Sequence, residues 1–449
     1  MKKRKVHIVS LGCPKNLVDS EVMAAALSKD RYRIVPEARD ADVILVNTCA
    51  FIGPAKEESI DEILRMAALK EGNGAVKLIV AGCLPQRYGK ALKDALPEVD
   101  LFLGISEVPN IARHADSLFL TKDPSPSPGL IVRKPLFLMD AGHERLISTP
   151  PYSAYLKIAE GCSNRCSYCV IPAIRGKARS RQMDDILQEA QNLAARGVKE
   201  LIMTAQDTTA YGSNLKGTAT LSNLLKDIAA VEGIRWIRLL YAYPVRLDRG
   251  LLETIAREEK ICKYIDIPIQ HVDDEILAAM NRKGTSRRIR EIIAEARKII
   301  PHVALRTSVI VGFPGETPAK FNRLLAFIKE TEFDHLGAFK YSREEGTAAA
   351  VLPRQVSERV KDARRMAIME EQAVISCEIN RSLVGSRGKV LVEGKSDIPE
   401  YPYVGRLERQ APDIDGITYI KGKHLSPGQF VDCRITDFEE YDLYVEAAP

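Results

Sequence analysis

Two long stretches of the chain alternate short apolar runs with helical patterns, and this alternation constrains the fold more than any other feature. Strands that alternate with helices favour a parallel sheet covered by helices on its faces. In the first stretch we expect strands at Val6–Leu11, Val43–Val46, Leu78–Ala81 and Val99–Leu103, and helices at Ser20–Leu27, Glu57–Lys70 and Gln86–Leu96. The sequence therefore predicts an N-terminal parallel α/β sheet domain over residues 1–120.

The second stretch repeats the pattern six times, with helices such as Asp184–Ala195 and Arg287–Ile299 between its strands. Six such units favour a partial (βα)6, TIM-like barrel over a closed eightfold one. The expected strands are Ala154–Ala159, Glu200–Thr204, Ile237–Tyr241, Tyr264–Ile267, Val303–Val311 and His335–Phe339. We place this domain at residues 151–377, after a linker at residues 121–150 whose Pro- and Ser-rich start, Thr121–Gly129, is incompatible with regular structure.

Near Glu378 the helical periodicity stops, and Gly and Pro punctuate short β-type runs. This pattern predicts a small, five-stranded, OB-like β-barrel over residues 378–449. Its expected strands are Lys389–Glu393, Val404–Leu407, Ile417–Ile420, Phe430–Ile435 and Leu443–Val445.

The chain shows neither a membrane span nor an export signal. No run approaches the ~20 apolar residues that cross a bilayer, and the apolar run behind the basic N-terminus is too short for a signal peptide. We therefore expect a cytoplasmic protein without a membrane partner. Nine cysteines, an odd number, are then better explained as metal ligands or buried thiols than as disulfides.

The sharpest local motif is C-x3-C-x2-C, formed by Cys162, Cys166 and Cys169 just after the first expected barrel strand. Barrel active sites form at this end of the strands. Three thiolates can bind three irons of a [4Fe–4S] cluster and leave the fourth open. The alternatives are a zinc site that lacks its fourth ligand and a chance group of buried thiols. Zinc sites usually pair two C-x2-C knuckles, and no second pair follows here.

Three further cysteines, Cys13, Cys49 and Cys83, each follow a different strand of the N-terminal domain. In an open parallel sheet, ligand sites form beyond the carboxyl ends of the strands. The three thiols therefore point to one crevice, although three buried structural cysteines are the alternative. We assign the remaining cysteines, Cys262, Cys377 and Cys433, as structural.

The C-x3-C-x2-C loop, with Tyr168 before its last cysteine, resembles the signature of the radical S-adenosylmethionine (SAM) superfamily. The resemblance implies that SAM chelates the open iron and is split to a 5′-deoxyadenosyl radical. It also implies that the segment from Val309 to Glu316, with Ile310 and Gly312, lines the adenine pocket. We add Gln206 and Gln270, which follow strands, to Tyr168, Ile310 and Gly312 as candidate SAM contacts. The alternatives are an ordinary Gly-Pro turn and loop-capping side chains.

The order of the three domains resembles the radical SAM methylthiotransferases over essentially the whole chain. In that family, an N-terminal three-cysteine domain precedes the radical SAM core and a C-terminal TRAM domain. The resemblance implies that Cys13, Cys49 and Cys83 hold an auxiliary [4Fe–4S] cluster, and that SAM also donates the methyl group. The reaction replaces C–H by C–S–CH3, and the sulfur is delivered from the auxiliary cluster. We expect an electron donor such as flavodoxin or ferredoxin to supply the electrons.

Two branches of this family differ in substrate. The MiaB group modifies adenosine in tRNA, and the RimO group modifies the β-carbon of an aspartate in protein twelve of the small ribosomal subunit. The segments Ser10–Glu21, Gln206–Thr209 and Tyr264–Asp274 resemble the RimO group. The tRNA branch typically has Gln-Met where Pro14-Lys15 stand.

The charge of the C-terminal region also favours the RimO group. Residues 378–449 contain nine Lys and Arg against thirteen Asp and Glu. An acidic module suits a basic ribosomal protein, free or in the small subunit, better than RNA phosphates, so direct nucleic-acid binding is not favoured. The alternatives are that these acids form a solvated face and, from another class, that the chain is a non-catalytic RNA-binding protein.

Overall fold

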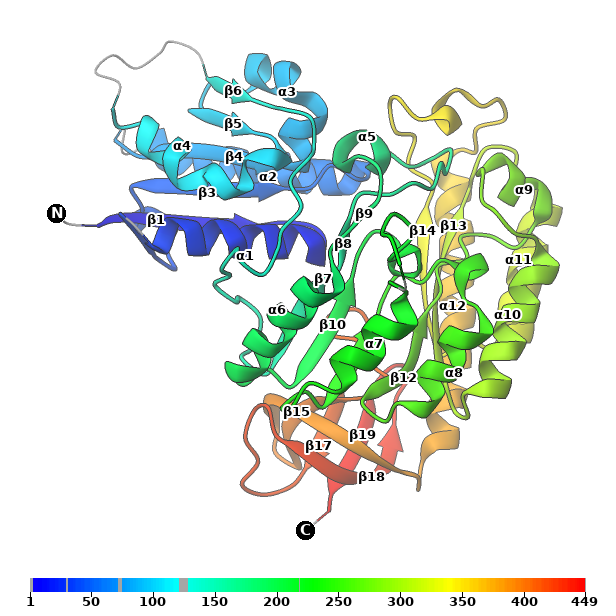
Figure 1. Cartoon of the computed structure of the whole chain (residues 1–449). Helices are drawn as coiled ribbons and strands as arrows, with labels where there is room; N and C mark the ends of the chain where they lie inside the picture. Colours follow the sequence, from blue (N-terminus) through cyan, green and yellow to red (C-terminus); the bar gives the residue numbers. More distant parts are fainter. Residues whose placement is uncertain (1–2, 30, 72–74, 121–127, 218, 449) are drawn as a thin grey trace. The chain divides into compact units, whose positions relative to one another are not determined.

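The computed structural model describes residues 3–29, 31–71, 75–120, 128–217 and 219–448 (Figure 1). The chain forms two compact units. Unit 1 comprises Met1–Ser148, Ala159–Arg181 and Ser342–Thr347, and unit 2 comprises Thr149–Ile158, Gln182–Tyr341 and Ala348–Pro449. Within the described residues, no helix combines the length and the apolar character that a membrane crossing requires.

A six-stranded parallel sheet with the order β2-β1-β3-β4-β5-β6 forms the centre of unit 1. Its strands are β1 Arg4–Ser10, β2 Tyr32–Ile34, β3 Val43–Thr48, β4 Lys77–Gly82, β5 Leu101–Leu103 and β6 Gly129–Ile131. The four expected strands are present, and β2 and β6 are additional. β2 contains the charged Arg33, and β6 directly follows the Pro- and Ser-rich stretch, so neither stands out as a strand in the sequence. β6 lies inside the expected linker, whose residues 121–127 fall outside the described part of the chain.

Helices cover both faces of this sheet, as the uniformly buried pattern of β3 requires. On one face, α1 and α4 pack against Val43 and Leu45, and on the other, α2 and α3 pack against Ile44 and Val46. The helical segments of unit 1 are α1 Pro14–Lys29, η1 Ala38–Asp40, α2 Gly53–Glu71, α3 Cys83–Ala95, η2 Ile105–Asn110, α4 Ile111–Ser117 and α5 Ile171–Arg175.

Unit 2 contains a second six-stranded parallel sheet, ordered β14-β13-β12-β11-β10-β7. All six expected strands are present, and the sheet is open, which confirms the partial barrel. The strands are β7 Ser153–Lys157, β10 Glu200–Thr204, β11 Trp236–Leu239, β12 Ile261–Asp266, β13 Ala304–Val311 and β14 His335–Lys340.

The helices of unit 2 follow its strands. Five of them begin at a Thr or Asp whose side chain accepts a backbone N–H of the first turn, namely Thr220, Asp248, Asp273, Thr285 and Thr317. The helical segments are α6 Met183–Ala195, η3 Thr208–Ala210, α7 Leu221–Ala229, η4 Pro244–Arg246, α8 Arg249–Arg257, α9 Asp274–Ala279, α10 Ser286–Ile299, α11 Pro318–Thr331, η5 Ala348–Val351 and α12 Glu358–Leu383.

The C-terminal strands close into the expected five-stranded barrel, ordered β15-β16-β17-β19-β18. Its strands are β15 Arg387–Ile398, β16 Tyr401–Leu407, β17 Thr418–Lys421, β18 Phe430–Phe438 and β19 Leu443–Ala447. The preceding helix α12 continues to Leu383, beyond the expected end near Glu378. Asn380 belongs to this last part of α12, and its side chain donates to the carbonyls of Glu439 and Glu440.

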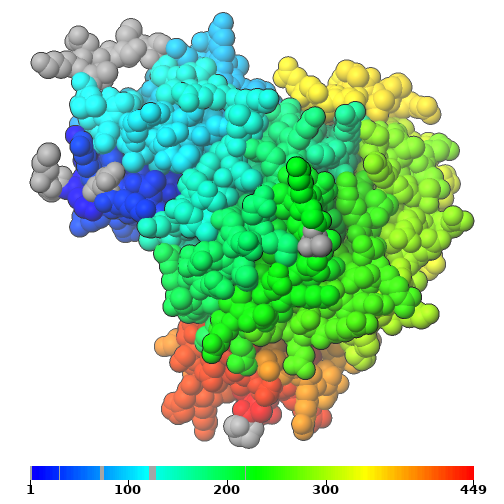
Figure 2. All heavy atoms as spheres, in the orientation of Figure 1, coloured from blue at the N-terminus to red at the C-terminus, as the bar shows by residue number. Residues whose placement is uncertain are grey.

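A buried ionic group joins the C-terminal barrel to the open sheet within unit 2, and Figure 2 shows the barrel in orange and red beside the green segments. The Glu200 carboxylate lies 3.0 Å from Arg238 Nε and 2.6 Å from Arg406 Nη2. Arg238 also donates to the carbonyl of Glu408. All three side chains of the group are almost fully buried, so this group fixes how the two parts of unit 2 meet.

Candidate functional site

Cys13, Cys49 and Cys83 lie at the carboxyl ends of three neighbouring strands, β1, β3 and β4. Cys13 precedes α1, and its carbonyl accepts the backbone N–H groups of Asn16 and Leu17. Cys49 follows β3, and Cys83 is the first residue of α3. The structure therefore brings these three predicted site residues to one edge of the unit 1 sheet.

Two glycines keep the backbone close to these thiols. Gly12 has φ +86°, and a Cβ atom there would lie 2.7 Å from Cys49 Cβ and 2.9 Å from Cys49 Sγ. Gly82 has φ +99°, and a Cβ atom there would lie 2.3 Å from Asn47 Oδ1. Both the conformation and the space demand glycine. The space that a side chain at residue 12 would fill borders a cysteine sulfur, which fits a cradle for a sulfur-bound group.

The three thiols influence one another. Burial raises the pKa of Cys83 to about 12 and also raises the pKa of Cys49, and the charge of Cys13 adds to both effects. Burial acts in the same direction on Cys13, but Lys15, Arg175 and backbone N–H groups of α1 outweigh it and lower the pKa. Bound metal would remove these protons, because thiolate is the form that ligates.

The loop with Cys162, Cys166 and Cys169 is closed at its base by the short antiparallel pair β8 Ala159–Glu160 and β9 Arg179–Ser180. Cys162 N–H donates to the carbonyl of Gly176, and Cys169 N–H donates to that of Cys166. Gly161 has φ +79°, and a Cβ atom there would lie 2.4 Å from the carbonyl oxygen of Lys177. The backbone at the start of the loop therefore packs closely against the backbone at its end.

This loop is part of unit 1, although the sequence placed it at the start of the barrel domain. Val170, next to Cys169, and Ile174 belong to the same hydrophobic core as Cys83 and Leu84. Helix α5, which follows the loop, packs against α3. Both cysteine triads therefore belong to one compact unit. The domain boundaries given above stay a prediction.

Sequence reasoning missed the side chains that connect the two motifs. Arg175 Nη1 lies 3.0 Å from Asp19 Oδ2 and 3.0 Å from Glu160 Oε2, and its Nη2 lies 3.2 Å from Asn16 Oδ1 and 3.5 Å from Cys83 Sγ. The sequence feature that could have revealed them is the pair Asn16 and Asp19, two polar residues three positions apart on the buried side of α1. Such polar groups need partners inside the protein.

Four of the candidate SAM contacts lie in unit 2, at or beyond the carboxyl ends of its strands. Gln206 is the second residue after β10, and Gln270 comes after β12 with φ +69° and forms an isolated β-bridge with Val309. Ile310 lies in β13, and Gly312 follows it with φ +74°. Tyr168 belongs to unit 1, and the role of all five residues stays a prediction.

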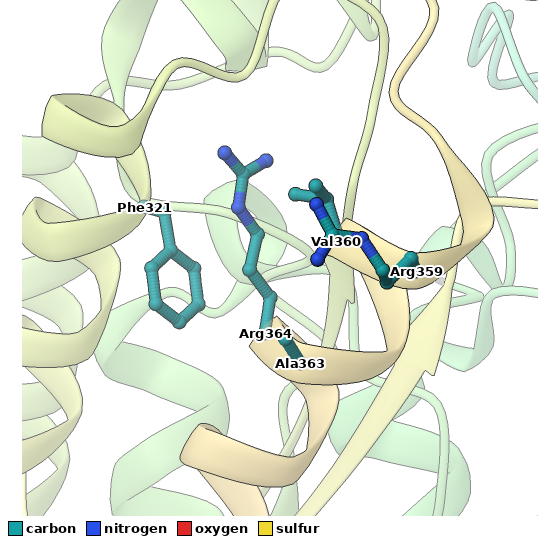
Figure 3. A pocket seen from close by; sticks show the side chains of 5 residues that line it. All are labelled: Phe321, Arg359, Val360, Ala363 and Arg364. Carbon is teal, nitrogen blue, oxygen red and sulfur yellow. The ribbon is translucent and has the colours of Figure 1, made fainter.

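Two neighbours of these candidates have structural roles. Asp207 caps η3, because its side chain accepts the N–H of Ala210, and it forms an ion pair with Arg246. Glu316 accepts the N–H of Gly312 and lies 3.2 Å from Arg364 Nη1, which stabilises the turn after β13. A cavity of about 320 Å³ lies beside Arg364, and Figure 3 shows Arg364 next to Phe321 in it. None of the candidate SAM contacts lines this cavity.

Among the described residues, no group of three or more His, Cys, Asp or Glu side chains has the geometry to hold a metal ion. A four-iron cluster spreads its cysteine ligands over separate irons, so their sulfurs need not lie as close as the ligands of one ion. The assignment of the six cysteines to two clusters therefore stays a prediction, which the donor chemistry and the Gly12 cradle support.

Three family models match the chain. Residues 5–104 match the uncharacterized protein family UPF0004, residues 156–328 match the radical SAM superfamily, and residues 384–448 match the TRAM domain. The chain is 62% identical over 448 residues to a protein of Syntrophus aciditrophicus named ribosomal protein uS12 methylthiotransferase RimO, with 99% of each chain covered. A protein of Geobacter sulfurreducens with the same name is 52% identical over 444 residues, which cover 99% of this chain and 98% of that protein.

Solved structures share the fold. The radical S-adenosylmethionine methyltransferase TsrM from Kitasatospora setae, with cobalamin and a [4Fe–4S] cluster bound, matches with a TM-score of 0.56 at 15% identity over 89% of this chain and 82% of that chain. The cobalamin-dependent radical enzyme OxsB matches with a TM-score of 0.52 at 13% identity over 82% of this chain and 56% of that chain. At these identities the likeness concerns the fold alone.

Proposed function

The chain belongs to the family of ribosomal protein uS12 methylthiotransferases named RimO, and we propose that it replaces a hydrogen on the β-carbon of an aspartate in uS12 by a methylthio group. The observation that carries this proposal is the pair of cysteine triads in unit 1, one on the sheet edge and one on the adjoining loop. One triad alone would provide either radical chemistry or a sulfur source, and this reaction needs both.

The cofactors of this enzyme are SAM and [4Fe–4S] clusters. When bound, they supply a 5′-deoxyadenosyl radical, sulfur and a methyl group for a carbon whose proton is too weakly acidic for side-chain bases. Cys162, Cys166 and Cys169 would hold the cluster that binds SAM. Cys13, Cys49 and Cys83 would hold the auxiliary cluster, with Gly12 allowing the backbone to approach Cys49 closely.

The residues of unit 2 would bind and orient SAM. Gly312 and Ile310 would provide close backbone and apolar contact at the end of β13, while Gln206 and Gln270 would provide polar groups. Glu316 keeps the Gly312 turn in place, because it accepts the Gly312 N–H and pairs with buried Arg364. Polar groups fixed in this way orient a ligand without reorganisation.

The C-terminal TRAM domain has more acidic than basic residues, which supports contact with a basic ribosomal protein. The substrate would be uS12, either free or in the small subunit, and the reductant a small electron-transfer protein such as flavodoxin or ferredoxin. Both the substrate and such a reductant would be met in the cytoplasm.

Mass spectrometry of cells that lack this gene tests the substrate. We expect uS12 to lose one methylthio group on a single aspartate, and expression of the intact gene to restore it. The tRNA from the same cells should keep its methylthioadenosine. Unchanged uS12 together with tRNA that has lost its methylthio group would instead identify a tRNA-modifying enzyme.

A further inference from the structure

Arg175 is one of the most completely buried charged residues in unit 1. Its side chain is 1% exposed, and its two carboxylate partners, Asp19 and Glu160, are 2% and 1% exposed. A buried guanidinium is costly unless every N–H finds a partner. Arg175 comes six residues after Cys169, and Asp19 comes six residues after Cys13, so one ion pair links the two cysteine motifs.

The two ends of the guanidinium have different partners. Nη1 forms the ion pairs, since it donates to Asp19 at 3.0 Å and to Glu160 at 3.0 Å. Nη2 lies 3.2 Å from the amide oxygen of Asn16 and 3.5 Å from Cys83 Sγ. An ion pair that only held α5 against the sheet would be complete with Nη1. Nη2 is therefore available for a different role, and Cys83 Sγ is one of its two hydrogen-bond acceptors.

We propose that Arg175 is a positioning residue for the auxiliary cluster. Its Nη2–H donates to the thiolate of Cys83 and so couples this ligand to the loop that carries the other triad. The inference rests on the proposed function and concerns a residue beyond the cluster ligands. Hydrogen bonds to the sulfurs of iron–sulfur clusters are among the factors that set their reduction potentials. A donor at Cys83 stabilises the reduced, more negative state and raises the potential.

The planar fork of arginine suits this task, because its N–H groups point in fixed directions to a carboxylate and a sulfur at once. Lysine would keep the positive charge between Asp19 and Glu160, but its single nitrogen cannot reproduce the fork. Arg175→Lys therefore separates the hydrogen bond to Cys83 from the charge. Arg145→Lys is the matched control, because Arg145 is also a buried arginine of unit 1 that pairs with a carboxylate of α1, Glu21 at 2.6 Å.

The test uses full-length protein in which Cys162, Cys166 and Cys169 are all replaced by Ala, so that only the auxiliary cluster remains. Its midpoint potential is measured by a redox titration followed by electron paramagnetic resonance, together with iron per chain. We expect Arg175→Lys to shift the potential to a more negative value and to speed the loss of iron to a chelator. Arg145→Lys should leave both quantities unchanged.

A second measurement needs no substitution at Arg175. Protein labelled with nitrogen-15 arginine is reduced, and pulsed electron paramagnetic resonance should detect a hyperfine coupling between the cluster and an arginine nitrogen. The proposal is overturned if this coupling is absent, or if Arg175→Lys keeps its iron at the unchanged potential. Absence of any cluster in the protein without the loop cysteines would overturn the auxiliary site itself, and with it the proposed function.

Discussion

Replacement of Gly12 by Ala tests how closely the backbone between β1 and α1 must approach Cys49. The added Cβ would lie 2.7 Å from Cys49 Cβ and 2.9 Å from Cys49 Sγ, at a φ of +86°. The backbone conformation alone costs a non-glycine residue about 1–3 kcal/mol. Overpacking adds about 1–3 kcal/mol when neighbours must move. The sum of about 2–6 kcal/mol is a large part of a typical folding stability of about 5–15 kcal/mol.

Because the added Cβ would overlap Cys49, the least costly way to relieve the overlap is to displace this cysteine. We therefore expect Gly12→Ala to lose the auxiliary cluster, so that iron falls from about eight to about four per chain. Cleavage of SAM should persist, because the atoms nearest to the added Cβ belong to Cys49 and not to the loop cysteines. Iron and sulfide analysis after anaerobic reconstitution, together with denaturant unfolding, provides the measurement.

Gly197→Ala is the matched control for backbone strain. Gly197 has φ +93°, but no atom lies within 4 Å of its added Cβ. This variant should lose about 1–3 kcal/mol of stability and keep about eight irons per chain. If Gly12→Ala also kept about eight irons, the close approach of Gly12 to Cys49 would not define the auxiliary site.

Three other predictions concern the two cysteine triads, the turn at Gly312 and the buried carboxylate of Glu200. Cys166→Ala should abolish the formation of 5′-deoxyadenosine, whereas Cys49→Ala should retain it and lose methylthiolation. Chromatography of the nucleoside and mass spectrometry of uS12 measure these two outcomes. Full methylthiolation by Cys49→Ala would refute the division of roles between the two triads. Gly312→Ala, whose Cβ would lie 2.2 Å from Lys361 Cγ, should weaken SAM binding at least about tenfold in equilibrium dialysis. Gly315→Ala, at φ +83° with open space, should bind normally, and equal affinity of both variants would contradict the role of Gly312. Burial opposes the charge of Glu200, but Arg406 and Arg238 outweigh it and lower the pKa from 4.5 to about 2, which corresponds to about 3 kcal/mol of stability. Because the pKa is lower in the folded state, this stabilisation is present above about pH 4.5 and is lost as the pH falls toward about 2. Denaturant unfolding of wild type and Glu200→Gln should therefore show a difference at pH 7 that shrinks on acidification, and a constant difference would refute it.

The strands and the N-terminal triad could be predicted because their signals are local. Apolar runs such as Val43–Val46 lie in buried strands, and Cys13, Cys49 and Cys83 each follow the end of a strand within about three residues. The rule that ligand sites form at the carboxyl ends of parallel strands then brought the three cysteines together. The short strands β2 and β6 were missed because β2 contains the charged Arg33 and β6 directly follows a Pro- and Ser-rich stretch.

The partner of α1 could not be predicted from the sequence. Asn16 and Asp19 meet an arginine 156 or more positions away, and no local pattern encodes such a pairing. For the same reason, the loop of Cys162 looked like the first loop of the barrel. Val170 and Ile174, which anchor it in the core of unit 1, read as ordinary apolar residues of a short helix.

Iron analysis of three proteins tests the central claim, that six cysteines form two separate cluster sites. After anaerobic reconstitution with excess iron and sulfide, the intact chain should hold about eight irons. Replacement of Cys13, Cys49 and Cys83 by Ala should leave about four irons, in the loop cluster. Replacement of Cys162, Cys166 and Cys169 by Ala should also leave about four irons, in the auxiliary cluster. An intact chain with about four irons, or a triad variant that loses all of its iron, would contradict two independent sites.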